Sequence, residues 1–225
     1  MWCLPNLDEG YLGQMEEVLG VYEKHYNPAE PVVCIDEKPV CLRSDVREPV
    51  AAKPGETAKR DSEYKRRGTA NVFCAIEPKA GRHFTVPTPN RSGAEFAKVV
   101  KRIVDAYPCA RTIHLVFDNL NTHRRKALTD HFGEEAGARI WNRVTPQYTP
   151  KHGSWLNQAE IEVSLFSRQC LGKRRIGSLE ELRRQATAWS RRVNRAKLKI
   201  EWQFTRRKAR RVFGCAPHRI RRSKY

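Results

Sequence analysis

The spacing of apolar residues along the chain predicts an alternation of β-strands and α-helices. Short apolar runs predict five strands, at 31–36, 71–78, 82–88, 112–118 and 143–148. Helical spacing predicts a partly helical segment within 1–30 and four helices, at 92–107, 122–132, 155–171 and 178–196. Ser178 and Glu181 form a capping box at the start of the last helix, and the polar stretch 43–68 predicts a surface loop. This order of elements predicts an α/β fold with a central mixed sheet flanked by helices.

Composition places the chain among soluble globular proteins. It has 225 residues, of which 40% are hydrophobic and 30% charged, and no apolar run is long enough to span a membrane. The first residues lack the basic-then-apolar order of a secretory signal, so we expect a cytoplasmic protein. The seven cysteines are scattered and form no C-x-x-C pair, which predicts reduced thiols and no zinc site.

The net charge of +18 is concentrated in the last quarter of the chain. Residues 168–225 contain 20 Lys and Arg against 3 acidic residues, whereas residues 1–167 are nearly balanced. Such segregation is typical of a surface that binds a polyanion, because each phosphate that is neutralised releases counterions. A solubilising tail and a ribosome-like RNA-binding segment are the alternatives. Seven residues are the candidate phosphate contacts: Lys173, Arg174, Arg175, Arg191, Arg192, Arg206 and Arg207.

Two acidic residues end apolar strand runs, and a third lies on a later helix. Asp36 and Asp118 end the runs at 31–36 and 112–118, where ligand sites of such sheets gather. The third acid is Glu160 or Glu162, which point about 200° apart on a helix and cannot serve one site. Glu160 lies beside the apolar stripe of this helix, on the flank that faces the sheet edge, and is the better candidate. Mg²⁺ prefers oxygen ligands, so three carboxylates in one place would form a site for this ion.

Three sequence blocks resemble the catalytic blocks of DDE transposases, of the insertion-sequence 630 type related to mariner transposons. These are VVCIDEKPV (32–40), LVFDNLNTHR (115–124) and YTPKHGSWLNQAEIEVSLFSRQCL (148–171), in this order. The segments KRRGTANVFCAIEPKAGR (65–82) and WSRRVNRAKLKIEWQFTRRKAR (189–210) resemble the same family. The resemblance implies a ribonuclease-H-like fold and a transposase that cleaves DNA at transposon ends and transfers the strand. It also implies two Mg²⁺ or Mn²⁺ ions, with Asp36, Asp118 and Glu160 as catalytic metal ligands.

Five further residues fall inside these blocks and are candidates for positioning the carboxylates or capping loops: Glu37, Asn119, Asn121, His123 and His152. We expect three segments, a helical lead-in at 1–30, a catalytic core at 31–171 and a basic helical segment at 172–225. Family members usually begin with helix-turn-helix domains that read the transposon ends, and these are not seen here. We therefore expect a separate helix-turn-helix polypeptide as a partner, and a homodimer assembled on DNA near the bacterial nucleoid.

Two other functions fit the same residues. A DNA-binding remnant of a truncated transposase would bind DNA without cutting it. A different ribonuclease-H-like nuclease, such as a resolvase or a nuclease for RNA–DNA hybrids, would use the same carboxylates on another substrate.

Overall fold

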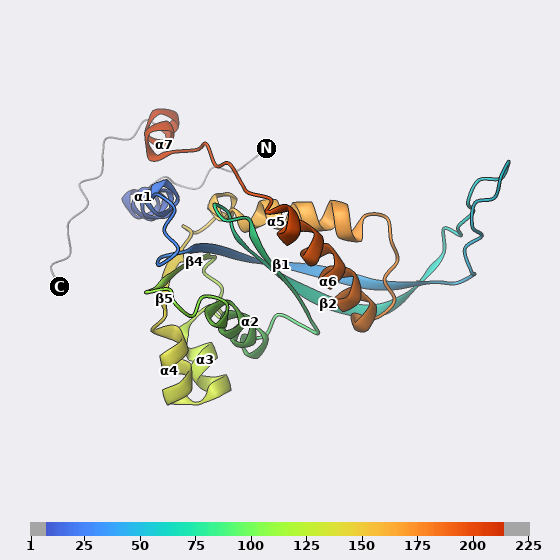
Figure 1. Ribbon diagram of the computed structural model, residues 1–225, viewed down its shortest axis with the longest axis horizontal. Helices are drawn as coiled ribbons and strands as arrows, with labels where there is room; N and C mark the ends of the chain where they lie inside the picture. The colour runs from blue at the N-terminus through green and yellow to red at the C-terminus, as the bar shows by residue number, and fades with distance from the viewer. Residues whose placement is uncertain (1–7, 214–225) are drawn as a thin grey trace.

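A five-stranded mixed sheet forms the centre of the computed structural model, which describes residues 8–213 (Figure 1). The strands are β1 (Val32–Asp45), β2 (Tyr64–Glu77), β3 (Arg82–Thr88), β4 (Ile113–Phe117) and β5 (Val144–Tyr148). Their order is β3-β2-β1-β4-β5. The pairs β1–β2 and β2–β3 are antiparallel, whereas β1–β4 and β4–β5 are parallel. The predicted α/β fold with a mixed sheet is therefore confirmed.

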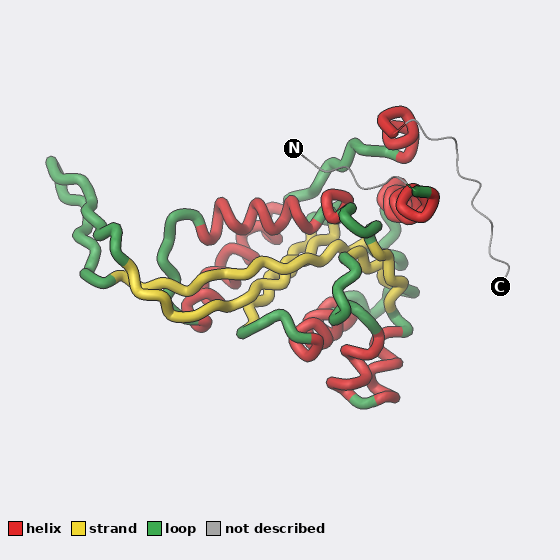
Figure 2. Tube along the Cα trace, turned by 180° about the vertical axis from the view of Figure 1, so that it is seen from behind, coloured by secondary structure: helices red, strands yellow, loops and turns green. Residues whose placement is uncertain are grey.

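Helices cover both faces of this sheet (Figures 1 and 2). The α-helices are α1 (Glu9–Glu23), α2 (Gly93–Asp105), α3 (Arg125–Phe132), α4 (Glu134–Trp141), α5 (Ala159–Phe166), α6 (Leu179–Ala196) and α7 (Arg206–Phe213). A 3-10 turn (Ser154–Leu156) precedes α5, and a π-helical turn (Ser167–Leu171) follows it. Helices α2, α3 and α4 lie on one face, α1, α5 and α6 lie on the other, and α7 packs on α1.

Alternation of side chains along β1 separates two cores. Val33 and Ile35 are buried in the core beneath α2, whereas Cys34 belongs to the core beneath α1. Because successive strand residues point to opposite faces, Asp36 lies on the α1 and α5 face and Glu37 on the α2 face. These neighbouring acids therefore reach different surroundings.

The first strand runs well past the residue at which the sequence predicted its end. β1 continues through Asp36 to Asp45 and stays paired with β2 as far as Tyr64. The expected surface loop at 43–68 is thus shorter, at 46–63, and the outer halves of both strands form a ribbon that projects from the body (Figure 2). We call residues 41–69 the arm. Its residues are polar and largely exposed, so no apolar run marked it as strand.

Two predicted helices differ from the observed ones. The expected helix at 155–171 consists of a 3-10 turn, α5 and a π-helical turn, because Asn157 lies outside helical geometry and its side chain caps α5 through the Ala159 amide. Helix α4 was not predicted, and it follows a break at Gly133, whose φ of 85° favours glycine. At α6 the Ser178 side chain accepts a hydrogen bond from the Glu181 amide, as the capping box predicted.

Among residues 8–213, no helix is both long enough and apolar enough to cross a membrane. The cysteines in this range carry free thiols, at Cys34, Cys41, Cys74, Cys109 and Cys170. Cys3 and Cys215 lie outside the described residues, as do the first residues of the expected lead-in and the last twelve of the basic segment.

Candidate active site

Asp36 lies within β1, half-buried on the α5 side of the sheet. Its Oδ1 atom accepts a hydrogen bond from the Glu37 amide at 2.8 Å. Burial, together with the negative charges of Glu37, Glu160 and Asp118, raises the pKa of Asp36 to about 7, against the lowering effect of that hydrogen bond. Asp36 is therefore close enough to both Asp118 and Glu160 for their negative charges to disfavour its ionised form.

Asp118 follows the last residue of β4, the parallel neighbour of β1. Its Oδ1 atom lies 2.7 Å from Nδ1 of His123 and accepts a hydrogen bond from the Leu120 amide at 3.2 Å. Burial alone would raise the pKa of Asp118, but the hydrogen bond and charge of His123 lower it below its usual value. Asp118 is thus held as a carboxylate at the carboxyl end of β4, next to β1.

His123 connects Asp118 to the first strand. Its Nε2 atom lies 2.6 Å from Oε1 of Glu37, and its ring packs against Phe96 and Phe117 at centroid distances of 4.4 and 5.5 Å. Burial would lower the pKa of His123, but its contacts with Asp118 and Glu37 raise it to about 9. A buried imidazolium between two carboxylates offsets part of their negative charge and fixes both side chains.

Glu160 stands in the first turn of α5 and is exposed, whereas Glu162 is buried. The start of α5 is held against β1 by Asn157, whose Nδ2 atom donates to the Ile35 carbonyl at 2.8 Å. Its Oδ1 atom accepts from the Ala159 amide at 3.1 Å. Asn157 therefore brings the first turn of α5 next to Asp36, and the opposite directions expected for Glu160 and Glu162 are observed.

The remaining loop candidates lie around the same sheet edge. Asn119 donates through Nδ2 to the Thr149 carbonyl and so ties the loop after β4 to the loop after β5. Asn121 is exposed in the loop after β4. His152 is exposed in the loop after β5, with a φ of 64° that few residues other than glycine adopt.

The basic residues expected to bind phosphate fall into two groups. Lys173, Arg174, Arg191, Arg192 and Arg207 are exposed. Arg175 instead holds the arm, donating to Asp45 and to three arm carbonyls, and Arg206 pairs with Glu23 of α1. Arg175 thus has most of its donors occupied within the chain, whereas the Arg206 side chain uses Nε for its pairing with Glu23.

The donor set at this edge fits a hard cation. Asp36, Asp118 and Glu160 offer only carboxylate oxygens, which Mg²⁺ and Mn²⁺ prefer. As the side chains stand between residues 8 and 213, no three His, Cys, Asp or Glu form a group that could hold a metal ion. The carboxylates would have to draw together around a cation, whose charge would offset their mutual repulsion.

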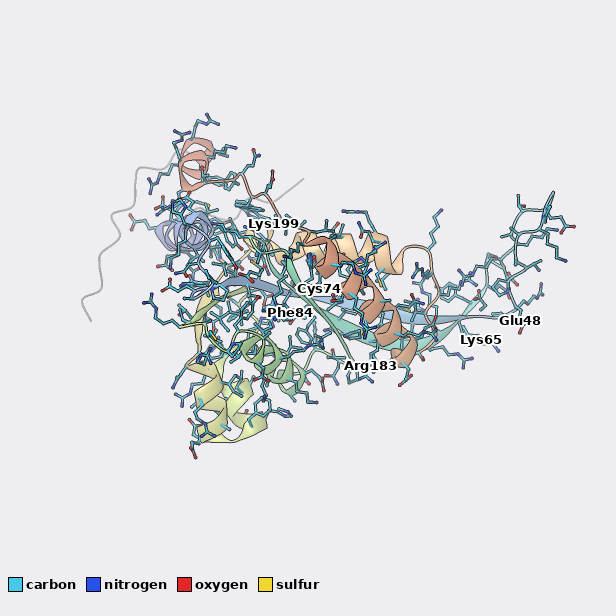
Figure 3. The ribbon with its side chains drawn as sticks, in the orientation of Figure 1. Glu48, Lys65, Cys74, Phe84, Arg183 and Lys199 are labelled. Atoms are coloured by element: carbon cyan, nitrogen blue, oxygen red, sulfur yellow. The ribbon has the colours of Figure 1, made fainter. Side chains whose placement is uncertain are left out.

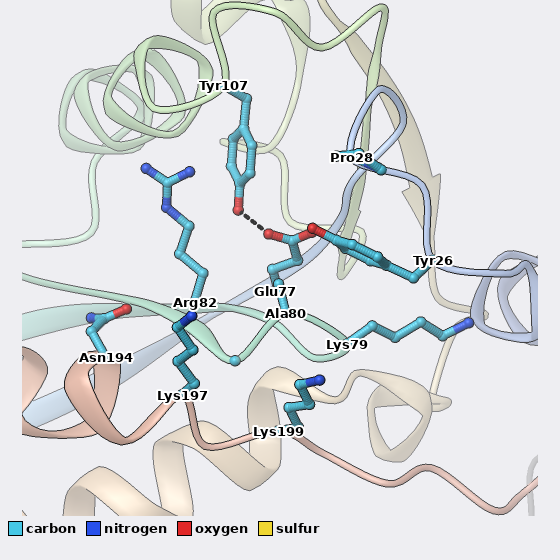
Figure 4. A pocket seen from close by; sticks show the side chains of 11 residues that line it. Tyr26, Pro28, Glu77, Lys79, Ala80, Arg82, Tyr107, Asn194, Lys197 and Lys199 are labelled. Atoms are coloured by element: carbon cyan, nitrogen blue, oxygen red, sulfur yellow. Dashed lines mark hydrogen bonds between the residues drawn. The ribbon is translucent and has the colours of Figure 1, made fainter.

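A cavity of about 590 Å³ lies away from these acids, beside the β2–β3 turn and the end of α6 (Figure 4). Lys79, Arg82, Lys197 and Lys199 are among its lining residues, and Tyr107 donates to Glu77 on one side. Sequence reasoning did not identify this cavity, because its residues come from four separate segments. It also missed Arg91, whose charge helps to lower the pKa of Asp118.

The fold is similar to solved structures of Mos1 transposase. The chain matches the Mos1 strand transfer complex with a TM-score of 0.54 and 15% identity, over 88% of this chain and 60% of that chain. The Mos1 mariner paired end complexes with Mn and with Mg each give 0.52, at 13% and 14% identity, over 88% of this chain and 61% and 62% of those chains. The chain thus spans about three fifths of the length of these proteins. The expected ribonuclease-H-like fold is confirmed.

A comparison with curated proteins gave no match. Residues 31–183, more than half of the chain, match the family model described as DDE superfamily endonuclease. This range contains every strand of the sheet and all three candidate carboxylates. The chain therefore belongs to the DDE superfamily endonuclease family.

Proposed function

We propose that this chain is the catalytic domain of a transposase, which cuts DNA at transposon ends and joins the freed strand to a target. The observation that supports the proposal is that the charges of both Asp118 and Glu160 act on the half-buried Asp36. Asp36 and Asp118 come from adjacent parallel strands, and Glu160 comes from a helix tied to β1 by Asn157. Family membership supports a metal-dependent endonuclease at this position.

In this proposal Asp36, Asp118 and Glu160 hold two Mg²⁺ or Mn²⁺ ions. Bound ions would supply an activated water or 3′-hydroxyl and offset the charge that develops on the phosphate. No protein nucleophile is then required, and the role of the carboxylates is to hold the metal ions with their oxygens. The number of ions and the role of each acid remain part of the proposal.

Four other residues keep the carboxylates in place. His123 and Glu37 fix Asp118 through hydrogen bonds of 2.7 and 2.6 Å at the two ring nitrogens. Asn157 fixes the start of α5, and Asn119 holds the loop that begins at Asp118. These contacts give the acids a defined starting geometry, which limits the rearrangement that a metal must impose.

DNA is the proposed partner of the basic side chains. Five basic residues are exposed and would contact phosphates, which gives affinity without sequence choice: Lys173, Arg174, Arg191, Arg192 and Arg207. One similar Mos1 structure is a paired-end complex with the left transposon end. We propose that this chain acts as a homodimer on paired ends in the cytoplasm, with end recognition supplied by a separate helix-turn-helix polypeptide.

The test is cleavage of a DNA duplex that carries the element's own ends, in the presence of Mg²⁺ or Mn²⁺. Asp118→Ala and Glu160→Gln should abolish nicking while leaving the circular dichroism spectrum unchanged. Asp105→Asn, an acid on the exposed face of α2, is the matched control and should cut normally. Full activity of Asp118→Ala would refute the proposal.

The same assay separates the two alternatives. A DNA-binding remnant would bind DNA in a salt-sensitive manner but would not cut it, whichever metal ion is added. A nuclease of another kind would prefer RNA–DNA hybrids or four-way junctions over transposon ends in a panel of substrates.

A further inference from the structure

Glu162 and His83 form a buried ion pair on the opposite side of α5 from Glu160. Both side chains are 1% exposed. The Nδ1 atom of His83, on β3, lies 3.0 Å from each carboxylate oxygen of Glu162, on α5. The proposed catalytic carboxylates do not include this pair, and 79 residues of sequence separate its members.

The other side of His83 is also fixed. Its Nε2 atom donates to the carbonyl oxygen of Leu198 at 2.9 Å, because a carbonyl oxygen can only accept, while Nδ1 donates to the Glu162 carboxylate. The side chain of Asn194 on α6 bonds both the amide and the carbonyl of His83, each at 2.9 Å. The ring of Trp189 stands edge-on to the imidazole at 6.3 Å. His83 is therefore locked between α6 and the segment that follows it.

The turn next to His83 allows little movement of β3 relative to α6. A Cβ atom on Gly81 would lie 2.5 Å from the backbone of Lys197, so the β2–β3 turn and the end of α6 are in direct backbone contact. Figure 4 shows Ala80, Asn194 and Lys197 gathered at this contact. In Figure 3, Cys74, the β1–β2 register partner of Asp36, lies mid-sheet under α6 and α5. Glu162 thus ties α5 to a rigid part of the molecule.

Helix α5 is consequently held on two sides. Asn157 bonds the Ile35 carbonyl of β1 ahead of the helix, and Glu162 bonds His83 of β3 within it. A helix held at one point can rotate about its axis, whereas attachments on two faces fix that rotation. A rotation of about 20° would move a carboxylate lying roughly 6 Å from the axis by about 2 Å. That displacement is as large as a metal–oxygen bond length for Mg²⁺, about 2 Å.

We propose that Glu162 and His83 are a positioning pair, which fixes the rotation of α5 and thereby directs Glu160 toward Asp36 and Asp118. The inference rests on the proposed role of Glu160 as a metal ligand. Stability alone does not require a buried ion pair here, because well-packed apolar residues of similar volume often stabilise a protein as well or better. The pair does supply a directional attachment, which apolar packing lacks.

The experiment measures Mn²⁺ binding by calorimetry on the full chain without DNA, together with the Mn²⁺ concentration that gives half-maximal nicking. His83→Ala and Glu162→Ala should weaken Mn²⁺ binding by about 10- to 100-fold, the usual effect of removing a group that orients metal ligands. Glu162→Gln keeps an acceptor for His83 and should show a smaller change. Ile103→Ala, a core substitution beneath the other sheet face, is the control for loss of stability and should bind Mn²⁺ as the wild type does.

Amide hydrogen exchange along α5 gives the second measurement. Exchange in Ala159–Phe166 should accelerate in His83→Ala and Glu162→Ala, but not in Ile103→Ala. Unchanged exchange and unchanged Mn²⁺ binding in folded pair variants would overturn the positioning role. If the wild type itself neither binds Mn²⁺ nor cuts DNA, the proposed function fails. Hydrogen exchange then decides separately whether the pair fixes α5.

Discussion

The Nδ1 atom of His123 lies 2.7 Å from the Oδ1 atom of Asp118, and this contact holds the loop after β4 against a carboxylate of the candidate site. The other ring nitrogen reaches Glu37 on β1, and the ring is enclosed by aromatic side chains. The imidazole is the partner of the buried Glu37 carboxylate, and a buried carboxylate that loses its partner is strongly destabilised.

Replacing His123 should therefore reduce both stability and activity. We expect His123→Ala to lower the free energy of unfolding by about 2–4 kcal/mol, since it leaves a cavity and an unpaired Glu37. Nicking by the folded variant should fall by about 10- to 100-fold, because Asp118 loses the group that orients it. Urea denaturation and single-turnover cleavage measure the two effects. His131→Ala, on the exposed surface of α3, is the control, and equal activity of the two variants would contradict the positioning role.

Much of the sheet could be predicted from the sequence because its strands are buried apolar runs. The same pattern placed Asp118 at the end of its strand, but β1 continues past Asp36, and the parallel pairing of β1 with β4 became known only from the structure. The choice of Glu160 over Glu162 rested on the apolar face of the predicted helix and on the resemblance of its sequence block, and the burial of Glu162 agrees with it. Whether these acids bind metal stays a prediction.

The rest depends on contacts between distant segments, which a local pattern does not contain. The arm was missed because a two-stranded ribbon that is exposed on both faces has no apolar alternation. His83 and Glu162 look like ordinary polar residues in the sequence, and only the packing of α5 and α6 on β3 brings them together. Arg175 was expected to contact phosphate, yet its neighbours in the structure are the carbonyls of the arm.

Arg175 should control the mobility of the arm. Its guanidinium donates to Asp45 at 2.7 Å and to the carbonyls of Asp61, Ser62 and Glu63 at 2.7–3.0 Å. We expect Arg175→Ala to raise the rate of tryptic cleavage within 46–63 by about tenfold or more, because local opening governs proteolysis. The midpoint of thermal unfolding should change little. Arg174→Ala removes a neighbouring exposed arginine, and equal cleavage of both variants would show that Arg175 does not anchor the arm.

The attachment of α7 to α1 should depend on Glu16 and Arg210. Glu16 is 5% exposed, and its two oxygens accept from Nε and Nη2 of Arg210 at 2.6 and 2.9 Å. A paired, largely buried carboxylate loses more than a surface ion pair when its partner is removed. We expect Arg210→Ala to destabilise the docked helix by about 2 kcal/mol. Hydrogen exchange in 206–213 measures this, and Arg207→Ala, an exposed neighbour on α7, should leave the exchange unchanged. Similar exchange in both variants would assign the docking to apolar contacts.

His114 should make the fold less stable in mild acid. It is buried on β4, and its Nε2 atom lies 3.0 Å from Nζ of Lys24, so the neutral ring accepts a hydrogen bond from the ammonium group. Burial, and then the charge of Lys24, lower the pKa of His114 below 6.5, although Glu30 lies 3.9 Å away. The unfolded chain therefore takes up a proton at His114 before the folded chain does. This favours unfolding as the pH falls from about 6.5 toward the lower folded pKa.

His114→Gln removes this protonation while keeping an acceptor for Lys24. Between pH 7 and pH 5 the variant should lose less free energy of unfolding than the wild type, as measured by urea denaturation at a series of pH values. His25→Gln, which removes an exposed histidine near the end of α1, should retain the full wild-type slope. Parallel curves for His114→Gln and the wild type would mean that His114 titrates alike in the folded and unfolded chains, and that the Lys24 contact does not disfavour its protonation.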